Sequence, residues 1–176
     1  MAVLDIITYP DVRLKQVAEE VTQFDASLEK FIFDLDETMN AGPGGVGIAA
    51  TQVGFMKRIV IIDISQYAEN QKLKSKKPKE IKHHGHLVLI NPEIIEWQGM
   101  KKGREGCMSV PDFTGNVIRA ENIKLTALDI KGQPQEYNME GFEARAAQHE
   151  IDHLDGLLFV DRLVSRRNDL FKRKSY

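Results

Sequence analysis

The sequence predicts an α+β fold built mainly from antiparallel strands, on two observations. Apolar or alternating runs typical of strands follow one another between residues 57 and 139. The clearest helical segment, residues 141–154, comes after these runs and does not alternate with them. The length of 176 residues fits one hydrophobic core, so we expect residues 1–176 to form a single domain.

The first elements are an extended start, a turn and a helix. Residues 1–22 read as an extended and irregular segment with a Tyr-Pro-Asp turn. A helix is expected to follow, because Asp25 or Ser27 can cap its first turn. Five apolar side chains then follow at helical spacing: Leu28, Phe31, Ile32, Leu35 and Met39. The Gly-Pro pair at residues 42–43 ends the helix, and its apolar face is expected to belong to the core.

The middle of the chain alternates strands with turns. Residues 57–64 (KRIVIIDI) predict a buried strand. Residues 66–86 are the most polar stretch and are rich in lysine, so we expect a solvated insertion loop between two strand-like flanks. Residues 87–97 predict a strand, an Asn-Pro turn and a second strand. Residues 121–139 alternate around a Lys-Gly pair and predict a hairpin.

The last part of the chain holds one helix, a short strand and a basic tail. The helix of residues 141–154 is followed by Gly156, a residue suited to the end of a helix. Four of its side chains share one face: Phe142, Ala146, His149 and His153. Residues 157–160 predict a last short strand, and a basic tail of residues 165–176 closes the chain.

Composition and charge exclude several classes of protein. A net charge of −2 argues against a nucleic-acid binder, which normally carries a strong basic excess. No run approaches the roughly 18 apolar residues of a membrane span. The N-terminus lacks the pattern of a signal peptide, so a cytoplasmic location is the default expectation. The single cysteine, Cys107, allows no internal disulfide, and a lone cysteine is usually a small buried hydrophobic side chain.

The sequence HEIDH at residues 149–153 matches H-E-x-x-H. On a helix, this spacing puts His149 and His153 on one face as metal ligands, with Glu150 beside them to accept a proton from water. The alternative is a solvated helix with two incidental histidines. A catalytic metal also needs a third protein ligand, and no histidine follows His153. Upstream, the thiolate of Cys107 can complete a His₂Cys set with one position open.

The glycine-rich run GVGIAATQ, residues 45–52, is the other notable motif. It lacks the Lys-Ser/Thr pair of a phosphate-binding loop and does not lead into a predicted helix, which argues against a nucleotide site. Its glycines allow close approach of a ligand to the backbone. The amide of Gln52 can donate to a developing oxyanion, or it can be satisfied by neighbouring backbone groups.

Three motifs in fixed order, GVGIAATQ, EGCMS and QHEIDH, together resemble the peptide deformylase family. The resemblance covers nearly the whole chain, including the TYPD start and the HLDG ending. It implies antiparallel β-sheets around a central HExxH-bearing helix, with the N-terminal helix packed outside. It implies hydrolysis of the N-formyl group from the formylmethionine of nascent polypeptides, with release of formate. It also implies one divalent metal, ferrous iron (Fe2+) in the cell, which Zn2+, Ni2+ or Co2+ can replace.

The resemblance also implies roles for individual residues. Cys107, His149 and His153 would hold the metal, and Glu150 would be the general acid and base. Gln52 and the backbone N–H of Met108 would line the oxyanion hole. The peptide would run beside four residues: Gly45, Val46, Gly47 and Gly106. The methionine pocket would include Phe142 and Arg145.

Further expectations concern residues near the site. We expect Arg145 to present its aliphatic stem to the pocket and its charged end to solvent, the alternative being an ordinary surface arginine. Glu105 and Arg119 are expected to pair and support the cysteine loop. Thr114 stands where many family members carry an arginine that helps to bind substrate. The lysine-rich loop offers a second metal site as an alternative to a simple solvated loop, through three histidines: His83, His84 and His86.

The remaining expectations concern partners and rival functions. The partners implied are N-formylmethionyl nascent peptides, with a weak ribosome contact through the basic tail and no membrane partner. We expect a monomer. The alternatives are an HExxH metallopeptidase, for which a downstream ligand is lacking, and a non-catalytic metal-stabilised peptide-binding module, for which a fourth ligand is lacking.

Overall fold

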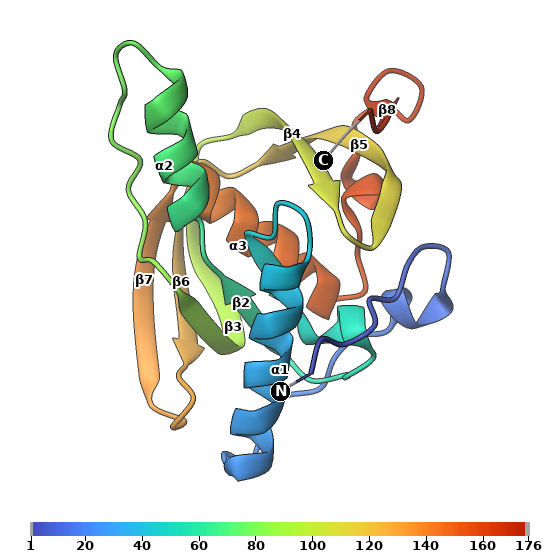
Figure 1. The fold of residues 1–176 in the computed structure, drawn as a ribbon, viewed down its shortest axis with the longest axis vertical. Coiled ribbons are helices and arrows are strands. Elements are labelled where there is room, and N and C mark those ends of the chain that lie inside the picture. The colour runs from blue at the N-terminus through green and yellow to red at the C-terminus, as the bar shows by residue number, and fades with distance from the viewer. Residues whose placement is uncertain (1, 175–176) are drawn as a thin grey trace.

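Two antiparallel sheets and three α-helices make up residues 2–174, the part of the chain that the computed structural model describes (Figure 1). The larger sheet has the order β1-β2-β3-β6-β7, and the smaller has the order β4-β5-β8. The strands are β1 (Gly47–Ala49), β2 (Ile59–Ile62), β3 (Leu87–Gln98), β4 (Lys101–Cys107), β5 (Val110–Arg119), β6 (Asn122–Leu128), β7 (Pro134–Glu140) and β8 (Leu170–Lys172). The helices are α1 (Ala26–Ala41), α2 (Ser65–Lys74) and α3 (Gly141–Leu154), with short 3₁₀ helices at Val12–Lys15, Ala50–Val53 and Phe159–Arg162. The predicted α+β class is confirmed.

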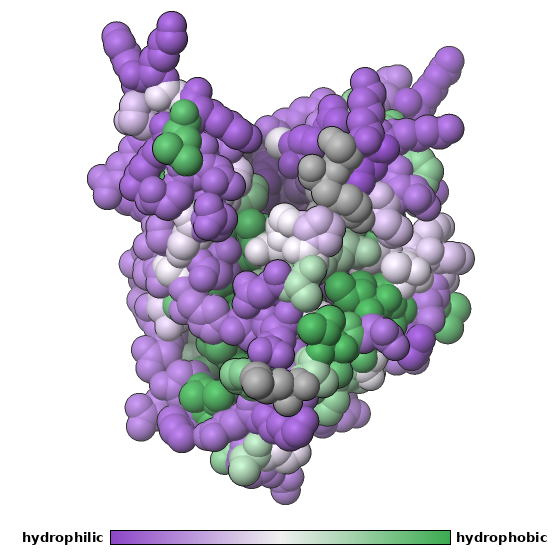
Figure 2. Space-filling view, in the orientation of Figure 1, coloured by the Kyte–Doolittle hydropathy of each residue, from purple (hydrophilic) through white to green (hydrophobic). Residues whose placement is uncertain are grey.

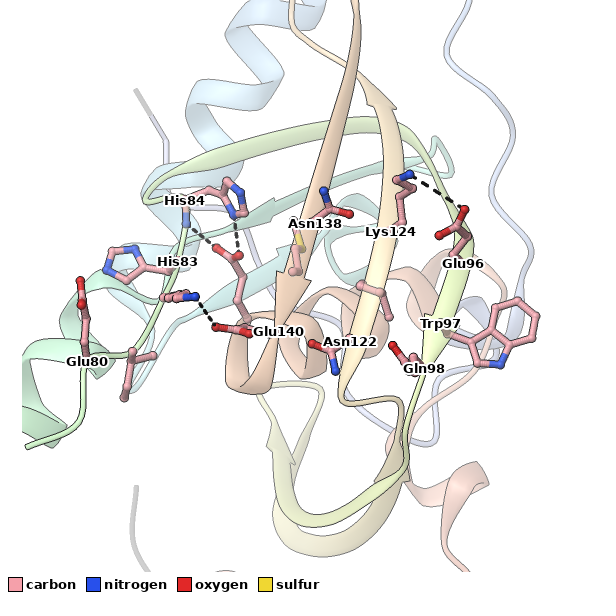
Figure 3. A pocket seen from close by; sticks show the side chains of 15 residues that line it. Glu80, His83, His84, Glu96, Trp97, Gln98, Asn122, Lys124, Asn138 and Glu140 are labelled. Carbon is pink, nitrogen blue, oxygen red and sulfur yellow. Dashed lines mark hydrogen bonds and ion pairs between the residues drawn. The ribbon is translucent and has the colours of Figure 1, made fainter.

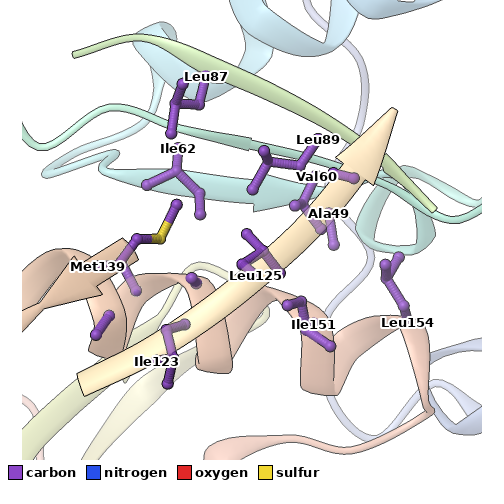
Figure 4. Packing of buried hydrophobic residues seen from close by; sticks show 14 of the residues in the cluster. Ala49, Val60, Ile62, Leu87, Leu89, Ile123, Leu125, Met139, Ile151 and Leu154 are labelled. Atoms are coloured by element: carbon purple, nitrogen blue, oxygen red, sulfur yellow. The ribbon is translucent and has the colours of Figure 1, made fainter. Parts of the chain in front are cut away.

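Strand β2 is buried on both faces, and each face holds a different helix. Ile59 and Ile61 belong to the hydrophobic cluster that includes the apolar side of α1. Val60 and Ile62 belong to the cluster that includes α3 (Figure 4). Successive side chains of a strand point to opposite faces, so one apolar run serves both helices. Full burial of each side chain stabilises the fold by about 2 kcal/mol. Helix α3 is thereby fixed against the sheet, with α1 on the other side.

Helix α1 has the predicted start and end. The side chain of Asp25 accepts a hydrogen bond from the backbone N–H of Leu28 at 2.9 Å, which caps the first turn. Gly42 follows the last helical residue, and its N–H donates to the carbonyl of Met39. Four of the five predicted apolar side chains are buried and Phe31 is half-buried, so the predicted core face is confirmed.

The turn predicted at the Asn-Pro pair of residues 91–92 is wrong, because β3 runs through it. The register between β3 and β6 shifts between Ile90 and Glu93, which marks a bulge. Pro92 has no N–H to give to the ladder, and the bulge removes it from the pairing. The side-chain amide of Asn91 pairs with both backbone groups of Val21, at 2.8 and 3.0 Å. The pair therefore bends the strand without ending it.

The polar stretch of residues 66–86 is only partly a loop, so the prediction of a loop throughout is wrong. Helix α2 occupies its first half, and residues 75–86 carry no helix or strand. Ala68 is the only residue of α2 that is buried. Tyr67 stacks on Phe142 of α3, with ring centroids 3.8 Å apart and an interplanar angle of 20°. These two residues anchor a helix that is otherwise solvated.

The C-terminal part also differs from the prediction. Residues 157–160 do not form a strand, because Phe159–Arg162 is a 3₁₀ helix that buries Phe159 in the core beside the smaller sheet. The basic tail contains a strand that was not predicted, β8, which pairs with β5 at Thr114 and Phe171. The tail therefore completes the smaller sheet.

The predicted hairpin of residues 121–139 is confirmed as β6 and β7. The hairpin of β4 and β5 was not predicted, yet it carries Cys107. Figure 1 shows it on the far side of α3 from β6 and β7, so α3 lies between the two sheets.

Within residues 2–174, no helix is long and apolar enough to cross a membrane.

Candidate metal centre

Helix α3 presents two buried histidines one turn apart. His149 is 9% exposed and His153 is 1% exposed, and their ring centroids are 5.1 Å apart. The helix reaches this depth because alanines line its contacts with the larger sheet, where Ala144 and Ala147 are fully buried. Small side chains let the helix backbone approach the strands closely. The HEIDH segment is therefore held in the interior of the protein.

The end of β4 brings Cys107 to the same place. Its Sγ lies 3.3 Å from Nε2 of His153, although 46 residues separate the two. The three candidate ligand atoms of Cys107, His149 and His153 all lie within 4.8 Å of one another. Two imidazoles and a thiolate suit a divalent transition metal and leave one tetrahedral position open. The donor set therefore fits a catalytic metal.

Glu105 fixes the orientation of His149. Its Oε1 lies 2.8 Å from Nδ1 of His149, which leaves Nε2 of that ring for a metal. Arg119 donates to both oxygens of Glu105 at 2.9 Å, which confirms the predicted pair, and Arg119 also bonds to Asp152. Burial acts to raise the pKa of Glu105, but the hydrogen bonds from His149 and Arg119 hold it well below its usual range. The carboxylate is therefore charged where it supports the ring.

Glu150 lies beside the ligands with one oxygen unused. Its Oε1 is 4.0 Å from Nε2 of His149, and no described group hydrogen-bonds to its Oε2. Burial raises the pKa of Glu150 to about 7. A β-carbon at Gly47 would lie 2.9 Å from both Cγ and Oε1 of Glu150, so glycine on β1 makes room for this carboxylate. A buried carboxyl group with this environment is suited to accepting and returning protons.

Hydrogen bonds to neighbouring groups hold the side-chain amide of Gln52 next to Cys107. Its Oε1 accepts the backbone N–H of Ala49 at 2.9 Å, and its Nε2 donates to Ser109 Oγ at 3.0 Å. The same nitrogen lies 3.6 Å from Sγ of Cys107. The backbone therefore satisfies the amide oxygen, as the alternative interpretation held, while the amide nitrogen faces Ser109 Oγ and Cys107 Sγ.

These groups open onto a cavity of about 280 Å³, and every predicted site residue except His153 lines it. Those residues are Gly45, Val46, Gly47, Gln52, Gly106, Cys107, Met108, Phe142, Arg145, His149 and Glu150. His153 lies deeper, behind the lining. Figure 2 shows the molecule hollowed between the α2 side and the β8 side, with hydrophilic residues along the rim.

The charged end of Arg145 does not lie in solvent, so that part of the prediction is wrong. Its guanidinium bonds to Glu105 at 2.6 Å, to the carbonyl of Lys101 at 2.6 Å and to the carbonyl of Val117 at 3.0 Å. A β-carbon at Gly103 would lie 2.8 Å from Cζ of Arg145, so the guanidinium lies over a glycine of β4. Arg145 therefore ties α3 to the hairpin that carries the thiolate.

Several lining residues were not predicted from the sequence. Tyr67 comes from α2, Arg104 from β4, and Arg173 from the residue after β8. Tyr67 lies in a segment with no clear apolar pattern, so no signal marked it. Asp152, the second partner of Arg119, lies inside the HEIDH motif at one of its variable positions.

A larger hollow of about 1090 Å³ lies along β3, β6, β7 and the loop before β3 (Figure 3). Two ion pairs lie along it: Lys124 pairs with Glu96, and Lys82 pairs with Glu140. Nδ1 of His84 lies 2.6 Å from Glu143. Among the described residues, the only cluster of three or more metal-ligating groups is at Cys107, so the loop histidines form no second metal site.

Comparisons of this sequence with known proteins agree on one family. The family model described as Polypeptide deformylase matches residues 3–169. A peptide deformylase of Alkalilimnicola ehrlichii is 44% identical over 174 residues, which cover 99% of this chain and 89% of that protein. A protein of Shewanella oneidensis that is named peptide deformylase 3 is 40% identical over 174 residues, which cover 99% of this chain and 97% of that protein.

Solved structures agree in fold. A peptide deformylase from Legionella pneumophila matches with a TM-score of 0.79 at 41% identity, covering 94% of this chain and 88% of that one. A peptide deformylase from Thermotoga maritima matches with a TM-score of 0.80 at 33% identity, covering 94% of this chain and all of that one. The arrangement of sheets and helices is therefore shared along nearly the whole chain.

Proposed function

Because this chain belongs to the peptide deformylase family, it is a metal-dependent hydrolase that removes the N-formyl group from nascent peptides, and we propose that the reaction takes place in the cavity beside Cys107, His149 and His153. One observation carries this assignment. Three donor atoms of the right chemistry converge at the wall of a small cavity that also contains a buried carboxyl group with an unused oxygen.

The proposed ligands are Cys107 Sγ and the Nε2 atoms of His149 and His153. A divalent metal held there supplies Lewis-acid chemistry, since it lowers the pKa of water and polarises a carbonyl group. We propose ferrous iron as the metal in the cell, as the family resemblance implies, with Zn2+, Ni2+ or Co2+ able to use the same donors. Glu105 keeps the His149 ring turned toward this position.

Glu150 is proposed to move the protons. Its unpaired Oε2 is free to accept a proton from the attacking water, and the same carboxyl group then returns a proton to the leaving amine. The attack turns the formyl oxygen into an oxyanion. The amide of Gln52 and the backbone N–H of Met108 are proposed to donate to it, and one such donor contributes about 3 kcal/mol.

The rest of the cavity is proposed to hold the peptide. Its backbone would run beside Gly45, Val46, Gly47 and Gly106, which all line the cavity. The methionine side chain would contact Phe142, the ring of Tyr67 stacked on it, and the stem of Arg145. A formyl carbon carries only a hydrogen, so a cavity of about 280 Å³ can admit it and exclude an internal peptide bond.

A formate-release assay tests the proposal. The protein is purified without oxygen, loaded with Fe2+ and offered a formyl-Met-Ala peptide. We expect formate and a free amino terminus, with no cleavage of internal peptide bonds. Internal cleavage would support the HExxH peptidase. Absence of any hydrolysis, with one metal bound and a native circular dichroism spectrum, would support a peptide-binding module and refute the proposal.

The cellular setting is also proposed. We propose that the protein acts as a monomer of one catalytic domain. The substrate class arises at ribosomes, which supports action in the cytoplasm of bacteria. The charged tail around Arg166 and Arg167 is exposed and can make a weak ribosome contact. Sedimentation analysis of the loaded enzyme, alone and with ribosomes, tests the monomer and the contact.

A further inference from the structure

Ser109 is a fully buried serine in the turn between β4 and β5. It does not line the cavity, whereas the two residues just before it, Cys107 and Met108, both do. A hydroxyl group at this depth needs a hydrogen-bond partner. The partner is Nε2 of Gln52, which donates to Oγ of Ser109 at 3.0 Å, although 57 residues separate the two. Ser109 therefore contacts a proposed oxyanion donor from outside the cavity lining.

The orientation of the Gln52 amide decides which way this hydrogen bond runs. Oε1 of Gln52 accepts from the backbone N–H of Ala49 at 2.9 Å, and a backbone N–H can only donate. The NH₂ group of Gln52 must then face Ser109. A hydroxyl group can donate or accept, so Ser109 accepts here. The amide is therefore held at both ends, with its nitrogen 3.6 Å from Sγ of Cys107.

Residues 7–9 connect the two segments that carry the proposed oxyanion donors. The N–H of Ile7 donates to the carbonyl of Gln52, and the N–H of Tyr9 donates to the carbonyl of Ser109, both at 2.7 Å. The side chain of Ile7 belongs to the same hydrophobic cluster as Cys107. The backbone of Ser109 is thereby fixed relative to the backbone of Gln52. Its hydroxyl group is therefore an acceptor with a defined position.

Resting on the proposed function, we propose that Ser109 is a positioning residue, which acts on the reaction through Gln52. Its hydroxyl group fixes the NH₂ end of the amide, so the amide is already oriented when charge develops on the formyl oxygen. A donor that is oriented beforehand stabilises the transition state better than a mobile one, because it does not reorganise during the reaction. Met108, whose backbone N–H is the other proposed donor, precedes Ser109 in the same turn. This turn therefore carries one donor and aligns the other.

Ser109→Ala tests the proposal, because it removes the acceptor and leaves the bond between Gln52 and Ala49. With the Fe2+-loaded enzyme and a formyl-Met-Ala peptide, we expect kcat to fall about tenfold, with KM and metal content unchanged. An unchanged kcat would overturn the positioning role and leave the proposed function standing. Absence of hydrolysis by the unmodified enzyme would overturn the proposed function itself.

Thr38→Val is the matched control for loss of a buried hydroxyl group. Thr38 lies on α1, is 1% exposed and does not line the cavity. Its Oγ1 donates to the carbonyl of Asp34 and accepts from the N–H of Leu4. This variant should be less stable than the unmodified protein and keep its kcat. A loss of kcat equal to that of Ser109→Ala would mean that reduced stability alone explains both, which would contradict the proposal.

A double-mutant cycle separates an effect through Gln52 from a general loosening of the site. Gln52→Met removes the amide and keeps a side chain of similar length. In that background, Ser109→Ala should lower kcat by no more than about twofold, because the group that Ser109 orients is absent. A further loss of about tenfold would show that Ser109 acts on something other than Gln52, and the proposal would be wrong.

A measurement on the unmodified protein decides the matter if Ser109→Ala does not fold. In the Zn2+-loaded protein, 15N relaxation gives the order parameter of each glutamine side-chain NH₂ group. We expect a value of about 0.85 for Gln52, as for rigid backbone, and below about 0.6 for Gln98, which is exposed at the end of β3. Equal values for the two side chains would mean that the Gln52 amide is mobile, and Ser109 would then have no positioning role.

Discussion

Glu105→Gln tests the support of the metal centre, because one buried carboxylate there accepts bonds from three side chains. Its Oε2 receives Arg119 Nε and Arg145 Nη1, and its Oε1 receives Arg119 Nη2 and faces Nδ1 of His149. Glutamine has nearly the same shape, but one of its two terminal atoms is a donor. Whichever way the amide turns, two donors must then face an NH₂ group.

The size of the effect follows from this geometry. Breaking a buried ion pair costs about 3 to 5 kcal/mol. Arg119 keeps its bond to Asp152, so we expect the lower end, a loss of about 3 kcal/mol in the free energy of unfolding. Release of the His149 ring should also weaken metal binding by about 10- to 100-fold.

Two measurements on the same variant check this reasoning. Urea unfolding of the metal-free protein gives the stability, and competition with a chelator gives the affinity for Zn2+. Glu93→Gln is the matched control, since Glu93 is an exposed carboxylate on β3. The reasoning is refuted if Glu105→Gln changes neither quantity more than the control does.

Three further changes probe the cavity. Gly47→Ala should push Glu150 out of place and lower kcat by about 100-fold with metal content unchanged, which kinetics and metal analysis check. Glu150→Ala should retain the metal and lower kcat by about 10²- to 10⁴-fold in the same assays. Tyr67→Ala removes the ring stacked on Phe142 and should reduce kcat/KM for a formyl-Met peptide about fivefold, whereas Leu73→Ala, on the exposed side of α2, should not.

Contrary results are easy to recognise. A Gly47→Ala enzyme with normal kcat would mean that the position of Glu150 is unimportant. Normal turnover in Glu150→Ala would refute the proposed role of the Glu150 carboxyl group in proton transfer. Equal effects of Tyr67→Ala and Leu73→Ala would mean that α2 acts only through stability and that Tyr67 does not touch the substrate.

The larger sheet and the HEIDH helix were predictable because their patterns are local. A run such as Ile59–Ile62 shows burial directly, and the spacing of His149 and His153 fixes a common helix face. Cys107 was assigned to the same site by its chemistry, since a soft ligand was missing and only one thiol exists. These inferences need no knowledge of distant contacts.

The missed features depend on contacts between distant segments. Helix α2 has no apolar stripe, so only the stacking of Tyr67 on Phe142 reveals why it lies where it does. The side chain of Arg145 was expected to reach solvent, but a glycine on β4 lets it turn to Glu105. No strand was predicted in the tail, but its pairing with β5 brings Arg173 to the cavity. Neither the direction of the Arg145 side chain nor the path of the tail can be inferred from helical or strand periodicity.

The most direct test of the account is a titration of the metal-free protein with Co2+ that follows formate release and metal binding together. We predict that activity rises in proportion to occupancy and saturates at one metal per chain, with an absorption band from the bond between Co2+ and the Cys107 thiolate. Cys107→Ala should lose both the band and tight binding. Full activity in the metal-free protein, or unchanged tight binding in Cys107→Ala, would contradict the account.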